Sequence, residues 1–193
     1  MCVETGVTLG SFTVDLDSRP AFNPGILTAG QAIQCGGLDA KYFVVKREVL
    51  EGSLRVVVCR GTKHGSLYAD EFEVGGFNWM CGEVREAVSK GVAWRGWCRV
   101  RHGQPLCGCT IVGMDGGRVH GGRIQVTVDK PMRAITRGQV CVVYGEDKGV
   151  IGGGEIEGVG ESYWEQGREG EVEEGWKSGE NDESAKLRDV YNV

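Results

Sequence analysis

The sequence has 193 residues, enough for one domain or two small ones with a hydrophobic core. Its apolar runs are shorter than the roughly 18 residues that span a membrane, and its start shows no signal or transit pattern, so we expect no membrane partner. Glycine is abundant, with 33 residues, short Val/Ile runs recur, and helix-length periodic segments are scarce. This composition predicts a mainly β fold with many turns.

The net charge of -5 is unevenly distributed along the chain. Residues 165–193 contain nine acidic and four basic residues, whereas residues 1–164 contain 18 of each sign. Within the neutral part, residues 94–137 contain eight arginines and lysines against two aspartates. A basic surface beside an acidic tail is typical of a protein that binds polyanions. Charge alone leaves open the alternative that these residues form a solvated strand face.

The N-terminal part of the chain is expected to form a small β-rich central domain. Residues 1–20 are an uninformative lead, and the central domain is placed at residues 21–69. Its clearest pattern is residues 41–61, where two apolar runs flank the turn residues Glu51, Gly52 and Ser53. This pattern predicts two neighbouring strands.

A second group of strands is expected over residues 70–164. Ile124, Val126 and Val128 alternate with polar residues, the period of a strand with one buried face. Because six short strands with short turns would otherwise expose sheet edges, we predict a closed six-stranded β-barrel. Residues 82–94 have helical potential, and residues 165–193, with almost no aliphatics, are predicted to be a disordered acidic tail. The six strand candidates are residues 72–80, 97–103, 106–113, 122–131, 139–145 and 149–156.

Two glycine-rich segments could be mistaken for phosphate-binding loops. These are Cys35–Ala40, "CGGLDA", and Gly152–Gly154 in "GVIGGGEI". Neither is followed by a helix whose N-terminus could hold a phosphate. We therefore predict that Gly152–Gly154 is a turn, a bulge or a tight corner where the last strand closes the barrel.

The cysteines and histidines do not form a recognisable catalytic or metal-binding set. Most of the eight cysteines lie in apolar runs, where a free thiol packs as a small hydrophobe. Cys98, His102, Cys107 and Cys109 come nearest to a metal set, but they lack the usual two-residue gap of a zinc knuckle. We therefore predict neither a metal site nor a catalytic residue in this chain.

Four blocks of the sequence stand out together. They are "LTAGQAIQCGGLDAKYFVVKR", "RGTKHGSLYADEF", "WCRVRHGQPLCGC" and "KPMRAITRGQVCVVYGEDKGVIGGGEI". In this order they resemble the tRNA-specific 2-thiouridylases, over about residues 22–156. The last block is the most specific, because it combines Arg-Ala, Gly-Gln, a Val-x-Tyr strand and a glycine-rich end. The motifs "HGSLY" and "VRHGQ" are nearest to the mitochondrial, eukaryotic branch of that family.

The resemblance implies a central domain and a translation-factor-like barrel that help to hold a tRNA. In that family a separate N-terminal domain adenylates the wobble uridine and delivers sulfur from a cysteine persulfide. Its SGG-x-D-S loop and cysteine pair are absent from this sequence, so we expect no cofactor here, and ATP would bind the missing domain. The implied partners are tRNA and a separate catalytic domain or sulfur-relay protein. The implied location is mitochondrial, although the lack of a targeting segment leaves a cytoplasmic location open.

The resemblance also implies tRNA-contacting positions at Arg99, Val100 and Gln139. Val100 stands where the family has tyrosine, Arg137 stands where it has proline before Gly-Gln, and "FNPGILTAGQ" lacks its usual histidine. From the residues themselves, Arg99 and Arg101 are two apart on a predicted strand and would meet successive phosphates. Gln139 can offer a donor and an acceptor to a ribose or base edge. The alternatives are solvated arginines and a turn-capping glutamine.

Three functional hypotheses follow from these patterns. The first is a tRNA-binding C-terminal portion of a 2-thiouridylase, a fragment or the partner of a catalytic chain. The second is a stand-alone RNA- or protein-binding barrel, or an inactive relic. The third is an enzyme that uses one of its own cysteines.

Overall fold

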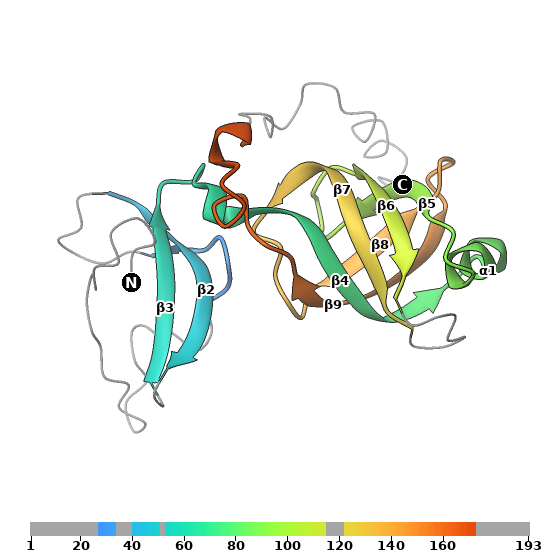
Figure 1. Cartoon of the computed structure of the whole chain (residues 1–193), viewed down its shortest axis with the longest axis horizontal. Helices are drawn as coiled ribbons and strands as arrows, with labels where there is room; N and C mark the ends of the chain where they lie inside the picture. The colour runs from blue at the N-terminus through green and yellow to red at the C-terminus, as the bar shows by residue number, and fades with distance from the viewer. Residues whose placement is uncertain (1–26, 34–39, 51–52, 115–121, 173–193) are drawn as a thin grey trace, which may run out of the picture. The chain divides into compact units, whose positions relative to one another are not determined.

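The computed structural model describes residues 27–33, 40–50, 53–114 and 122–172. Within these ranges, no helix is both long and apolar enough to cross a membrane. The described residues divide into two compact units (Figure 1). Unit 1 runs to Tyr68 and also includes Ser162–Val172, and unit 2 comprises Ala69–Glu161. The segment Cys35–Ala40 lies outside the described residues except for Ala40.

Unit 1 contains an antiparallel sheet in the order β1-β2-β3, formed by β1 (Ala32–Ile33), β2 (Tyr42–Leu50) and β3 (Ser53–Arg60). The two strands predicted around Glu51–Ser53 are therefore confirmed. Alternate residues of β2 and β3 are buried in two separate clusters, which is the two-residue period of a strand. One cluster contains Tyr42, Val44, Val56 and Val58, and the other contains Phe43 and Cys59.

The chain returns to unit 1 after the last barrel strand. Tyr163, only 3% exposed, packs with Phe43, Cys59, Leu67 and Tyr68. The short 3-10 helices η2 (Gly65–Leu67) and η3 (Glu169–Glu171) belong to this unit. The predicted acidic tail is thus described only as far as Val172, and its first eight residues are part of unit 1. Residues 173–193 lie outside the described residues.

Unit 2 is a closed barrel of six antiparallel strands, as predicted, in the order β4-β7-β6-β5-β8-β9 (Figure 1). Each of the six predicted segments supplies one strand. The predicted helix is also present, as α1 (Gly82–Ser89), and its Val88 is buried in the barrel core. The strands are β4 (Tyr68–Trp79), β5 (Trp94–Arg99), β6 (Cys107–Gly113), β7 (Ile124–Arg133), β8 (Val140–Tyr144) and β9 (Val150–Val159).

The glycine run Gly152–Gly154 lies inside β9, so the prediction of a turn there is wrong, whereas the predicted alternative of a bulge or tight corner where the last strand closes the barrel agrees with the irregular pairing to β4. The run pairs with β4 where that strand closes the barrel, and the irregular register lies between Gly75 and Asn78 of β4. A Cβ atom on Gly152 would come within 2.4 Å of Phe77 Cε1 and 2.5 Å of the Asn78 carbonyl oxygen. The glycines are therefore required because another backbone and a buried ring pass unusually close.

Candidate nucleic-acid interface

Arg99 lies on the outer face of β5, at the end of that strand. Cys98 and Val100 on either side of it belong to the buried barrel core, so Arg99 points the other way because strand residues alternate in direction. Arg99 is paired in register with Val142 of β8 and is half-buried. Its Nε atom is buried, and no described residue accepts a hydrogen bond from it.

Two of the predicted site residues are placed differently from what the sequence predicted. Val100 is 2% exposed, so its side chain is part of the barrel core and is not available to a ligand. β5 ends at Arg99, and Arg101 therefore does not continue the strand beside it. The expectation that Arg99 and Arg101 line one strand face is wrong, because the chain bends directly after Arg99.

Arg101 instead binds the connection between β7 and β8, residues 134–139. Its Nη2 donates to the Ala134 carbonyl oxygen at 2.5 Å and lies 3.4 Å from Thr136 Oγ1. Its Nε donates to Gln139 Oε1 at 3.3 Å. Partial burial, together with the nearby charge of Arg133, lowers the pKa of Arg101 from its ordinary value. The guanidinium is therefore largely occupied by the protein itself.

The 134–139 connection is held in a defined conformation. Ala134 and Gly138 both have positive φ angles, 57° and 84°, and Ile135 is buried in the core. The Gly138 N–H donates to the Ile156 carbonyl oxygen at 2.9 Å, and the Ile156 N–H donates to the Gln139 carbonyl oxygen at 2.8 Å. The backbone of Gln139 is thus fixed to β9, while its side chain contacts Arg101.

The basic residues of segment 94–137 are not equivalent in the structure. The side chains of Arg99, Lys130 and Arg137 form no hydrogen bond or ion pair with another described residue, whereas the Arg95 side chain is paired with Asp129 at 2.7 Å. Arg118 lies outside the described residues. Arg137 is exposed in the 134–139 connection, which also contains Gln139. Arg99 ends β5, and Arg101, two residues later, hydrogen-bonds to that connection. The two arginines with unpaired side chains therefore lie on the two segments that Arg101 joins.

The barrel cysteines are interior residues. Cys98, Cys107, Cys109 and Cys141 are all buried, and they are free thiols. Burial raises the pKa of Cys107, and a hydrogen bond with Cys98 together with burial raises the pKa of Cys109. Because the thiolate is the reactive form, these thiols are poor nucleophiles. His102 is exposed rather than gathered with them, and in the described ranges no three His, Cys, Asp or Glu residues are arranged to hold a metal ion.

The barrel matches a known domain family. Residues 69–156 match the model of the aminomethyltransferase beta-barrel domain, which covers most of unit 2. The six-stranded fold of unit 2 and this family match therefore both indicate a β-barrel domain.

The similar proteins indicate a narrower class than the domain match does, because they are tRNA-specific 2-thiouridylases. The chain is 30% identical over 146 residues to the mitochondrial tRNA-specific 2-thiouridylase 1 of Gallus gallus, covering 74% of this chain and 32% of the relative. It is 32% identical over 141 residues to the tRNA-specific 2-thiouridylase MnmA of Protochlamydia amoebophila, covering 72% and 34%. The human mitochondrial relative is 29% identical over 139 residues, with 72% and 31% covered. The chain thus spans about a third of the length of the curated relatives it matches.

Sequence reasoning found Arg99, Arg101 and Gln139 but missed the roles of Ala134 and Thr136. These two residues carry no charge or motif that singles them out, and their part depends on a contact with Arg101 across more than 30 residues of chain. The only local signal was the Gly138-Gln139 pair, which indicated a turn but not its partner.

Proposed function

We propose that this chain is the tRNA-binding portion of a tRNA 2-thiouridylase, in which the barrel holds the tRNA. The adenylation and sulfur transfer would then be carried out by a catalytic domain outside this sequence, which is the part that would bind ATP. The relatives reported above include mitochondrial and bacterial enzymes, and we place this chain with the mitochondrial branch on the motifs "HGSLY" and "VRHGQ".

One observation carries the proposal. The side chains of Arg99 and Arg137 have no partner among the described residues. Arg99 ends β5, Arg137 lies in the 134–139 connection, and Arg101 joins these two segments through its hydrogen bond to the Gln139 amide. Unpaired arginines are suited to phosphate oxygens, and a side-chain amide beside them is suited to a ribose or base edge. The site residues that we propose to contact tRNA are therefore Arg99, Arg137 and Gln139, with Arg101 in a supporting position and Val100 in the core.

The test is the salt dependence of tRNA binding. Phosphate contacts release counterions, so the association constant should fall as salt is added. Replacing Arg99 and Arg137 together by Ala should weaken binding and make the slope of log K against log salt shallower by about one to two units. Fluorescence anisotropy with an unmodified tRNA at several salt concentrations measures both quantities.

The matched control removes two positive charges elsewhere. Lys41 in unit 1 and Lys90, which caps the end of α1 and pairs with Glu86, are exposed, and their joint replacement by Ala changes the net charge by the same amount. This control should leave the slope unchanged. The proposal fails if the chain does not bind tRNA at low salt, or if both double variants change the slope equally.

A further inference from the structure

The contact between Arg101 and Gln139 fixes which end of the glutamine amide faces Arg101 and which end is left without a described partner. A guanidinium has only N–H donors, so the amide atom facing Arg101 Nε at 3.3 Å must be the oxygen. The Gln139 Nε2 group lies at the other end of the amide. No described residue accepts a hydrogen bond from it.

Arg101 is itself held in place at its other end. Its Nη2 contacts the Ala134 carbonyl oxygen and Thr136 Oγ1, and Thr136 Oγ1 in turn donates to the Ala134 carbonyl oxygen at 3.0 Å. The planar fork of the guanidinium therefore bridges the start and the end of the 134–139 connection. A lysine, with a single ammonium, does not offer this fork.

We propose that Arg101 is a positioning residue that turns the Gln139 amide so that it presents only N–H donors to the RNA. Gln139 then selects a hydrogen-bond acceptor, an oxygen or ring nitrogen of the tRNA, and does not accept from a donor. Arg101 displaces no counterion in this arrangement, because its guanidinium stays bound to the protein. This inference rests on the proposed function, since it assigns the chemistry of one contact within that interface.

The decisive experiment is a double-mutant cycle on tRNA affinity with Arg101→Ala, Gln139→Ala and the double variant. If Arg101 acts through Gln139, each single variant should weaken binding by about two- to tenfold, the scale of one hydrogen bond. The double variant should then be no weaker than the weaker single variant. The salt slope should be the same in all four proteins, in contrast to the Arg99 and Arg137 double variant.

Two further variants separate positioning from charge. Arg101→Lys keeps the charge but loses the fork, so it should bind tRNA as weakly as Arg101→Ala. It also provides a second test should Arg101→Ala fold poorly. Gln139→Glu should keep or raise the melting temperature, because a carboxylate pairs with Arg101. It should bind tRNA more weakly than Gln139→Ala, because it presents an acceptor where a donor is needed.

Three results would overturn the inference while leaving tRNA binding intact. These are a salt slope shallower by about one unit in Arg101→Ala, independent losses that multiply in the double variant, and wild-type affinity in Arg101→Lys. A readout without RNA tests the positioning separately from the proposed function. The side-chain amide resonances of Gln139 in ¹⁵N–¹H spectra should shift in Arg101→Ala, and unchanged resonances would contradict the contact.

Discussion

At the scale of single residues, glycine shows how the same sequence pattern can have different structural causes. Gly138 has a φ of 84° and lies in the connection between β7 and β8, where a turn requires it. Gly152–Gly154 instead lie within β9, and a Cβ atom on Gly154 would come within 2.4 Å of the Gly75 carbonyl oxygen. The first case follows from backbone conformation, the second from close packing between two strands.

The Gly152 position gives a residue-scale prediction for stability. Gly152→Ala should lower the free energy of unfolding by about 1–3 kcal/mol, because the added methyl would overlap the buried Phe77 ring and the Asn78 carbonyl oxygen. Gly82→Ala is the matched control, since nothing lies within 4 Å of its added Cβ and it stands at the start of α1. It should be neutral or slightly stabilising. Urea denaturation measures both, and equal stability of the two variants would contradict the packing argument.

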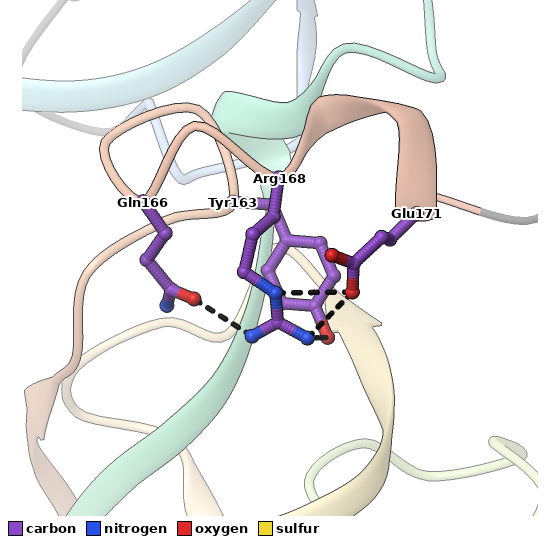
Figure 2. Close-up of polar contacts among 4 residues, drawn as sticks. All are labelled: Tyr163, Gln166, Arg168 and Glu171. Carbon is purple, nitrogen blue, oxygen red and sulfur yellow. Dashed lines mark hydrogen bonds and ion pairs between the residues drawn. The ribbon is translucent and has the colours of Figure 1, made fainter.

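At the scale of elements, the segment Ser162–Val172 is organised around one arginine (Figure 2). Arg168 Nη1 donates to Gln166 Oε1 at 2.8 Å, and its Nε and Nη2 donate to Glu171 Oε2 at 3.0 and 2.7 Å. Its guanidinium carbon lies 4.3 Å from the centre of the Tyr163 ring. Tyr163 is buried in unit 1 and attaches the segment to that unit. The Arg168 network therefore holds residues 166–171 against the Tyr163 ring.

Two truncations test whether this segment stabilises the protein. Deleting residues 165–193 removes Arg168 and Glu171, and it should lower the melting temperature of unit 1 by several degrees, about 4–8 °C per kcal/mol lost in a small domain. Deleting only residues 173–193 should leave it nearly unchanged, because that stretch has little apolar surface to bury. Differential scanning calorimetry of both proteins and of Arg168→Ala would show the difference. Identical melting temperatures for the two truncations would mean that residues 165–172 contribute nothing.

At the scale of the whole molecule, opposite charges are concentrated in different parts of the chain. Residues 173–193 contain six acidic and three basic residues, whereas the side chains of Arg99, Lys130 and Arg137 in unit 2 have no described partner. A net negative segment on the same chain competes with phosphate for a basic surface, and the competition weakens as salt shortens the Debye length. The net charge of -5 is therefore compatible with a local polyanion site.

Removing this acidic segment should strengthen tRNA binding at low salt. Deletion of residues 173–193 should raise the affinity by about two- to threefold near 50 mM salt, and the gain should vanish as ionic strength rises. Replacing the six acidic residues by Ser and Gln at constant length should have the same effect, because charge and not length is the cause. An equal gain at low and high salt would point to a steric origin.

The local pattern of the sequence determined the class of fold. The period of two at Ile124–Val128 and the two apolar runs around the turn residues in 41–61 predicted strands, and the need to remove sheet edges led to a closed barrel. These features follow from neighbours in the chain, so they can be read without coordinates.

The tertiary structure alone decided which side chains meet. Arg101 contacts residues more than 30 positions away, Tyr163 packs into a cluster built from residues 43–68, and Gly152 is constrained by Phe77. The alternation of residues within one strand predicts none of these contacts, because each contact depends on how separate strands and loops are brought together. The role of Arg101 therefore changed from a predicted phosphate contact to a residue that positions Gln139, since a bend after Arg99 directs its guanidinium to the 134–139 connection.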